Sequence, residues 1–310
     1  MRVGLIGGTG FVGSHLVDEL VAQGHRPRLL VRPGSEHKVE HGREVETVTG
    51  TVEDAGAVRS TLEGTEAAIY NIGLLREFPR RGISFQAMHV DGPRRVADVA
   101  GGLGVSRMVL MSANGVRADG TPYQRTKFEA EQYLRGTDLE WTIFRPSVIF
   151  GPPRGRTEFC TRLLEQMIRP PLPAPLFFEG LNIARAGAFR MAPVHVLDVA
   201  RAFVKALDLP EAVGQVYTLC GPQQRSWKEI IQTIATAVGR SKWMVPVPVL
   251  PLRVAAAVLD RVEAFPITGD QLIMLLEGNV CASGHGFEPF GGEPRPFSAQ
   301  NLAYLRAGSP

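Results

Sequence analysis

The sequence predicts an α/β fold: a doubly wound parallel sheet followed by a small, mostly helical C-terminal region. A short apolar run at residues 3–6 leads into closely spaced glycines and then into a helical pattern. Further apolar runs alternate with helical patterns as far as residue 150, which is typical of βαβ units. The chain has 310 residues, enough for one large α/β domain or for a domain with a smaller appendage.

The N-terminal glycines predict a phosphate-binding turn between the first strand and the first helix. One glycine permits the turn, one lets the backbone approach a pyrophosphate, and one allows the helix to pack closely on the strand. The helix N-terminus adds N–H groups and a positive dipole end. The predicted cofactor contacts in this stretch are Gly7, Gly8, Thr9, Gly10, Phe11, Val12 and Gly13.

The end of the second strand, expected over residues 25–31, predicts which dinucleotide binds. An acidic residue about twenty residues beyond the glycines would bind the adenosine ribose of NAD, whereas an arginine suits the 2′-phosphate of NADP. This chain has Arg32 there, and the first carboxylate comes only at Glu36. We therefore expect NADP as cofactor, with NAD as the alternative. Thr51, Glu53 and Asp54 follow the third strand, and none is assigned firmly to the adenine.

Other expected strand ends supply further candidates, because ligands of open α/β sheets bind at the carboxyl edge. The fourth strand, residues 67–72, ends at Asn71 and Gly73, which are candidate cofactor contacts. The next loop carries Arg76, Arg80 and Arg81 beside apolar residues. It is either an ordinary solvated loop, the favoured interpretation, or a contact for an anionic or membrane-surface partner.

A tyrosine and a lysine predict the chemistry. Tyr123 and Lys127 open a helix after the fifth strand, residues 107–111, and their spacing of four places them on one helical face. A nearby ammonium would favour the phenolate and lower the pKa of Tyr123 from about 10. Tyr123 would then be a general acid or base, with Ser112 at the strand end as a third candidate.

The rest of the chain predicts the substrate region. A sixth strand over residues 141–150 would present Pro146, Ser147 and Val148 to the nicotinamide end of the cofactor. We expect a dinucleotide-binding domain over residues 1–155 and a substrate region over 156–310, with 190–222 returning to the sheet. The expected helices cover residues 157–168, 227–238, 252–262 and 298–305. The stretch 170–188 is expected to be a loop or hairpin, and prolines are expected to break structure at 246–251.

Bulk properties exclude several classes of protein. The net charge of +3 is too small to indicate a nucleic-acid partner, and no apolar run is long enough to span a membrane. The three cysteines, Cys160, Cys220 and Cys281, are widely spaced, which predicts reduced thiols and argues against a disulfide frame or a zinc site. With the first strand beginning at residue 2 or 3, no signal segment is expected, and a cytoplasmic location is predicted.

Together these motifs resemble the short-chain dehydrogenase/reductase superfamily in its extended or atypical branch. The matching stretches are residues 7–13, the Tyr123 and Lys127 pair, and residues 145–151 and 193–200. More narrowly, residues 73–77, 85–92, 111–113, 123–129 and 267–272 resemble relatives of the nucleotide-binding accessory subunit nine of the respiratory complex I alpha subcomplex.

The resemblance implies a Rossmann sheet and a division of roles. Tyr123 would protonate a substrate carbonyl as the hydride arrives, Lys127 would bind the nicotinamide ribose, and Ser112 would hydrogen-bond the substrate oxygen. The superfamily usually has asparagine where this chain has His89.

Three functions stay open. The favoured one is an NADP-dependent oxidoreductase acting on a carbonyl or alcohol, with a quinone-like or apolar substrate suggested by the apolar C-terminal region. The second is a nucleotide-binding accessory or assembly protein of an electron-transfer complex, with peripheral membrane or complex association. The third is a sugar-nucleotide epimerase or dehydratase.

Overall fold

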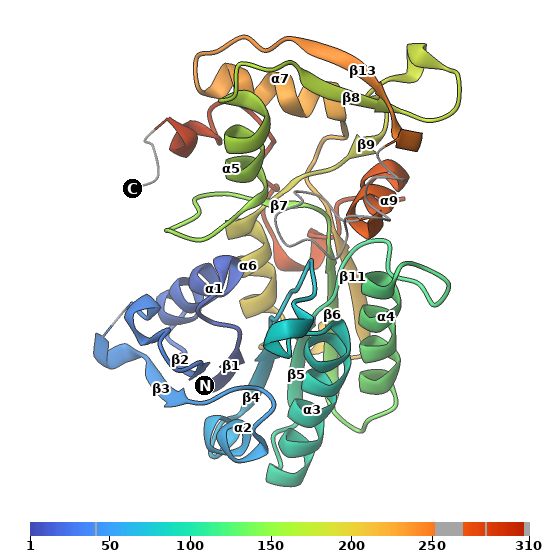
Figure 1. Ribbon diagram of the computed structural model, residues 1–310. Helices are drawn as coiled ribbons and strands as arrows, with labels where there is room; N and C mark the ends of the chain where they lie inside the picture. The colour runs from blue at the N-terminus through green and yellow to red at the C-terminus, as the bar shows by residue number, and fades with distance from the viewer. Residues whose placement is uncertain (41, 252–268, 283, 307–310) are drawn as a thin grey trace. The chain divides into compact units, whose positions relative to one another are not determined.

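The computed structural model describes residues 1–306 apart from 41, 252–268 and 283 (Figure 1). Residue contacts group the chain into two units, each described below by itself. The first consists of Met1–Pro146, Val196–Leu219 and Gly286–Gly292, and the second of Ser147–His195, Cys220–His285 and Glu293–Pro310. The first change of unit comes earlier than the predicted boundary at residue 155, and that domain assignment stays a prediction.

The first unit contains a seven-stranded sheet in the order β11-β6-β5-β4-β1-β2-β3. Every neighbouring pair is parallel. The strand order reverses between β1 and β4, so their carboxyl ends form the switch point where ligands of such sheets bind. The predicted fold class is confirmed. The strands are β1 (Arg2–Ile6), β2 (Arg26–Val31), β3 (Glu46–Thr49), β4 (Ala67–Tyr70), β5 (Arg107–Met111), β6 (Glu140–Pro146) and β11 (Gln215–Leu219).

Helices cover both faces of this sheet, as Figure 1 shows. They are α1 (Phe11–Ala22), α2 (Ala55–Leu62), α3 (Gly92–Leu103), α4 (Pro122–Arg135) and α6 (Val196–Lys205). Helix α1 packs with α6, whereas α3 packs with both α2 and α4. The central strands are buried on both sides, and β4 and β5 are buried along their whole length. Near-continuous apolar runs are typical of parallel strands that are covered on both faces.

Helices α2 and α4 each have a side-chain cap at the N-terminus. Asp54 caps α2 by accepting from the backbone N–H groups of Gly56 and Ala57, so this carboxylate serves the helix. Thr121 and Gln124 form a capping box at the start of α4. The box sets where α4 begins and therefore where Tyr123 and Lys127 lie along it.

The helical segment between β4 and β5 has two parts. It begins as a π-helical turn over Gln86–Asp91 and continues as α3 to Leu103, ending at Gly104 in the left-handed conformation. At the junction, a Cβ on Gly92 would overlap the hydroxyl oxygen of Tyr70, and that hydroxyl donates to the carbonyl oxygen of Met88 at 2.5 Å. This buried tyrosine occupies the space where a side chain on residue 92 would lie.

The second unit combines helices with short strand pairs. Its elements are β7 (Ile149–Phe150), α5 (Phe159–Leu163), β8 (Ala174–Phe178), β9 (Arg190–Met191), β10 (Val194–His195), β12 (Arg225–Ser226), α7 (Trp227–Ala237), β13 (Met244–Pro248) and α9 (Gly269–Glu277). The pairs are β7 with β10, β8 with β13, and β9 with β12. Ser226 and Glu229 form a capping box at the start of α7.

Several predicted boundaries in this part of the chain are wrong. The expected strand over residues 141–150 is interrupted after Pro146, and the expected helix over 157–168 ends in a π-helical turn, Leu164–Ile168. The stretch expected to be a loop or hairpin contains β8, and β13 runs through the first of the expected proline breaks. Each strand of this two-stranded sheet has a free edge, where a proline can lie without an N–H to donate. The expected tail helix is reduced to a 3-10 turn, Ala303–Leu305, and the one over 252–262 lies outside the described residues.

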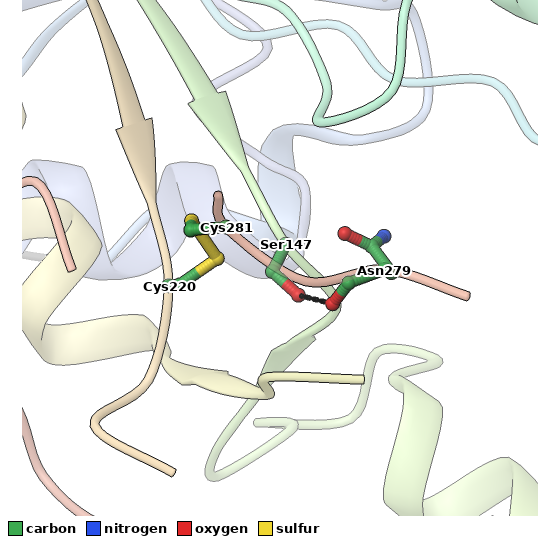
Figure 2. The surroundings of a disulfide bond; sticks show 4 residues. All are labelled: Ser147, Cys220, Asn279 and Cys281. Atoms are coloured by element: carbon green, nitrogen blue, oxygen red, sulfur yellow. Dashed lines mark hydrogen bonds between the residues drawn. A yellow bond between two sulfur atoms is a disulfide. The ribbon is translucent and has the colours of Figure 1, made fainter. Parts of the chain in front are cut away.

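The cysteines do not behave as predicted. Cys220 and Cys281, both in the second unit, form a disulfide with a Cα–Cα distance of 6.1 Å (Figure 2). Cys160 is a free, buried thiol. Wide spacing misled the prediction, because residues far apart in sequence meet in the fold. Disulfides persist mainly in oxidising compartments, so the cysteines no longer support a cytoplasmic location. Of the helices that the structure describes, none is both long and apolar enough to cross a membrane.

Candidate active site

The glycine-rich turn lies at the switch point of the sheet. Gly7 has φ of +94°, a left-handed conformation that favours glycine, and a Cβ there would lie 2.6 Å from the carbonyl oxygen of Asn71. A Cβ on Gly13 would overlap the carbonyl oxygen of Gly7. The turn therefore needs glycine at both positions, one for backbone conformation and one for the close approach of α1.

The start of α1 suits a phosphate. Gly10 is the N-cap and supplies no side-chain cap, and the first turn of the helix carries no acidic residue. The first N–H groups of a helix lack partners within the helix, and they carry the positive end of its dipole. A dinucleotide pyrophosphate fits these groups. Thr9, Phe11 and Val12, between the glycines, are each partly exposed.

Arg32 directly follows β2, at the carboxyl edge of the sheet. Its side chain is exposed, and its carbonyl oxygen accepts from the N–H of Ser35 across a turn in which Gly34 has φ of +81°. The arginine is thus placed where the sequence predicted it. Its contact with a 2′-phosphate stays a prediction.

Lys127 is held at the carboxyl ends of β4 and β5. Its Nζ donates to the carbonyl oxygens of Ile72 and Met111, each at 2.9 Å, and the side chain is buried. Ile72 lies between the candidates Asn71 and Gly73, and Met111 precedes Ser112. The lysine therefore ties both strand ends to α4, one helical turn beyond Tyr123.

Burial dominates the electrostatics of the pair. It raises the pKa of the Tyr123 phenol to about 12 and lowers the pKa of the Lys127 ammonium to about 7, while the nearby Glu131 carboxylate raises the latter. The prediction of a lowered pKa for Tyr123 is wrong for this structure, because burial desolvates the phenolate and disfavours it. The phenol is therefore protonated near neutral pH.

Ser112 takes part in a buried network that the sequence reasoning missed. Its Oγ donates to Oε1 of Glu131 at 2.5 Å, and Glu131 also accepts from Nε of Arg145 at 2.8 Å. Nη2 of Arg145 lies 2.5 Å from Oε2 of the same carboxylate, which completes a bidentate pair. Glu131 is fully buried and follows Lys127 by four residues, a spacing that could have revealed it. A contact between Ser112 and a substrate stays a prediction.

His89 is a second residue whose position was not predicted. It is fully buried, and its ring meets the ring of Tyr123 edge-on at a centroid distance of 5.2 Å. The signal in the sequence was only that histidine replaces an expected asparagine.

The remaining candidates are placed as follows. Asn71 is buried and its N–H donates to the carbonyl oxygen of Ile6, whereas Gly73 is exposed. The carbonyl oxygen of Pro146 accepts from the N–H of Asn114. In the second unit, Oγ of Ser147 donates to the carbonyl oxygen of Asn279 at 3.0 Å, as Figure 2 shows, and the carbonyl oxygen of Val148 accepts from Val194. Contacts of residues 146–148 with a nicotinamide stay a prediction.

Comparison with known proteins identifies the family. A family described as NAD(P)H-binding matches residues 7–166. The chain belongs to this NAD(P)H-binding family. This match supports the resemblance to the short-chain dehydrogenase/reductase superfamily that the sequence motifs indicated.

The relatives have different named activities. The chain is 30% identical to the ceramide reductase of Caulobacter vibrioides over 259 residues, which cover 83% of this chain and 77% of the relative. It is 25% identical to the mitochondrial NADH dehydrogenase [ubiquinone] 1 alpha subcomplex subunit 9 of Mus musculus, over 97% of this chain and 79% of the relative.

A solved structure shows the same fold. The UDP-glucose 4-epimerase of Thermus thermophilus, in complex with NAD, superposes with a TM-score of 0.64 at 20% identity, covering 90% of this chain and 100% of that one.

In the part of the chain that the structure describes, no group of three or more His, Cys, Asp or Glu residues could hold a metal ion. The family binds NAD(P)H.

Proposed function

We propose that this protein is an NAD(P)H-dependent oxidoreductase that reduces an apolar carbonyl compound or oxidises the corresponding alcohol. The observation that supports it most is the position of the Tyr123 and Lys127 pair on α4, with Nζ of Lys127 bonded to carbonyl oxygens at the ends of β4 and β5. These strand ends belong to the same sheet edge as the glycine turn, because all neighbouring strands are parallel. A bound nicotinamide would supply or accept the hydride.

The side chains suit the reduction direction. As the carbonyl carbon takes up a hydride, its oxygen takes the proton of the Tyr123 hydroxyl, which is present near neutral pH because burial raises the pKa to about 12. A charged Lys127, one helical turn away, would favour the phenolate that remains. Glu131 supports the charged form of Lys127, since it raises the pKa of that ammonium.

The substrate class is proposed from a relative and from composition. The relative with 30% identity is named a ceramide reductase, which supports an apolar carbonyl, and the apolar C-terminal region pointed to the same class or to a quinone. NADP is the proposed nucleotide because of Arg32, with NAD as the alternative. A cytoplasmic location stays a prediction.

The experiment is a nucleotide-binding titration followed by turnover with a panel of long-chain ketones, quinones and UDP-glucose. We expect NADPH to bind and to be consumed with an apolar carbonyl compound, and Tyr123→Phe to abolish turnover while cofactor affinity stays nearly unchanged. Retained turnover in that variant would rule out Tyr123 as the proton donor.

Two other functions carry specific support. The accessory-subunit relative matches 97% of this chain, so a nucleotide-binding role in an electron-transfer complex, at a membrane periphery or without turnover, is the second candidate. Binding of NADPH without consumption by any compound of the panel would favour it. Conversion of UDP-glucose with retained NAD would favour an epimerase, which the shared fold supports as the third candidate.

A further inference from the structure

His89 lies in the π-helical turn Gln86–Asp91 and is fully buried within the first unit. Its Nε2 accepts the N–H of Leu74 at 3.1 Å, and its Nδ1 lies 3.2 Å from Oγ1 of Thr126. Because Nε2 accepts, the proton of the neutral ring belongs on Nδ1, where it can be donated to Thr126. Oγ1 of Thr126 in turn donates to the carbonyl oxygen of Pro122 at 2.8 Å. Both ring nitrogens are thus used.

The faces of the same ring are also covered. His89 stacks on Phe85 at a centroid distance of 5.2 Å with an interplanar angle of 20°, and it meets Tyr123 edge-on at 5.2 Å and 88°. Phe85 touches the Tyr123 ring as well, at 5.9 Å. Burial, with a smaller effect of the Lys127 charge, lowers the pKa of His89 to about 2, so the ring is neutral at neutral pH.

We propose that His89 is a positioning residue that joins the loop after β4 to helix α4 and thereby holds both Tyr123 and Lys127 in place. Leu74 comes two residues after Ile72, whose carbonyl oxygen accepts from Nζ of Lys127, and Thr126 precedes Lys127 in α4. His89 is therefore hydrogen-bonded to the loop that carries Ile72 and to the helix that carries Lys127, the two partners of the lysine hydrogen bond. Its ring packs against Tyr123. This inference rests on the proposed function, since it assigns a role within the same site.

Glutamine, asparagine and alanine at position 89 would keep different subsets of the two histidine hydrogen bonds. The side-chain oxygen of glutamine can reach the place of Nε2 and accept from Leu74, whereas asparagine can reach only the place of Nδ1 and its Thr126 contact. Alanine removes both bonds and the ring. Losing one buried hydrogen bond at the site is expected to lower the affinity for NADPH by about tenfold.

The test measures NADPH affinity by calorimetry in the whole protein and in His89→Gln, His89→Asn and His89→Ala. We expect His89→Ala, which loses both bonds, to weaken binding by more than about tenfold, and His89→Gln, which keeps the Leu74 bond, to bind NADPH more tightly than His89→Ala. Affinity equal to wild type in His89→Ala, or glutamine no better than alanine, would overturn the proposal.

A second pair of variants guards against misfolding of the histidine variants. Thr126→Val removes the partner of Nδ1, and Thr61→Val is its matched control, because Thr61 is also buried and donates to the carbonyl oxygen of Ala57 four residues earlier. We expect weaker NADPH binding in Thr126→Val than in Thr61→Val. Equal affinities would contradict the proposal.

A measurement without cofactor separates this inference from the proposed function. NMR of protein with 15N-labelled histidine is expected to show His89 neutral and protonated on Nδ1 at about pH 5 as well as at about pH 8. The amide signal of Leu74 should shift in His89→Ala. Titration of His89 near its ordinary pKa, or a proton on Nε2, would overturn the arrangement. Failure of wild type to bind any nicotinamide nucleotide would count against the proposed function alone.

Discussion

The Nζ of Lys127 and the carbonyl oxygen of Ile72 lie 2.9 Å apart, although 55 residues separate them in the sequence. The same Nζ donates to the carbonyl oxygen of Met111. Backbone carbonyls satisfy the donors of a buried ammonium but carry only partial charge, so they offset its desolvation incompletely. The pKa of Lys127 accordingly falls to about 7.

This lowered pKa predicts how stability depends on pH. Between about pH 7 and 10.5 the unfolded chain binds a proton at Lys127 that the folded protein does not, so a rise in pH through this window stabilises the folded state. Relative to Lys127→Met, the free energy of unfolding of the wild type should increase by about 2 kcal/mol from about pH 7 to pH 9.

Urea unfolding at several pH values measures this difference. Lys205→Met is the matched control, because Lys205 is an exposed lysine on α6 of the same unit. The wild type and Lys205→Met should follow parallel curves. A curve for Lys127→Met that is also parallel to them would show that Lys127 does not titrate in this window.

The sequence was sufficient for those parts of the site that depend on local spacing. The glycine turn follows from residues 7–13, and the shared face of Tyr123 and Lys127 follows from helical periodicity. The direction of the Tyr123 pKa shift could not be predicted, because it depends on how much of the molecule surrounds the phenol. Glu131 and His89 escaped notice for a similar reason: their partners come from distant segments of the chain.

Arg32 predicts the nucleotide preference. We expect NADPH to bind more tightly than NADH, because a guanidinium can form charge-assisted hydrogen bonds with the 2′-phosphate. Arg32→Ala should narrow the ratio of the two dissociation constants by about tenfold or more. Fluorescence titration with each nucleotide measures this ratio.

Arg26→Ala is the control for this prediction. Arg26 is likewise exposed, but it begins β2, whereas Arg32 follows its carboxyl end. The ratio should be unchanged in Arg26→Ala. Equal affinities for the two nucleotides in the wild type would refute the role of Arg32.

The buried carboxylate of Glu131 predicts a large loss of stability on substitution. Glu131→Gln leaves the Arg145 guanidinium without its bidentate partner and weakens the acceptor of Ser112. Breaking a buried ion pair by changing one partner costs about 3 kcal/mol or more. Thermal and urea unfolding of the variant measure the change.

An exposed ion pair between α4 and α3 provides the comparison. Glu129 forms an ion pair with Arg94 at 2.8 Å, and both side chains are more than one-third exposed. Exposed pairs contribute between about zero and 1 kcal/mol, so Glu129→Gln should be nearly neutral. Similar losses in the two variants would mean that burial of Glu131 does not set its energetic role.

The second unit shows why cysteine spacing alone did not predict pairing. Cys220 lies directly after β11 and Cys281 beyond α9, separated by 61 residues. Nearby, the carbonyl oxygen of Asn279 accepts from both the Ser147 hydroxyl and the Ala192 N–H, which fixes the segment that carries Cys281. Long-range contacts of this kind bring the two thiols together.

This disulfide predicts a redox-dependent stability. Closing a loop of this length restricts the unfolded chain enough to stabilise the folded state by about 4 kcal/mol. Reduction of the wild type should therefore lower its midpoint of urea unfolding, whereas a reductant should not affect the Cys220→Ala/Cys281→Ala double variant. Thiol titration of the unfolded protein checks the bond itself: one of the three cysteines, Cys160, should react before reduction and all three afterwards. Three reactive thiols without reductant would show that the bond does not form, and the cysteines would again support a reducing compartment.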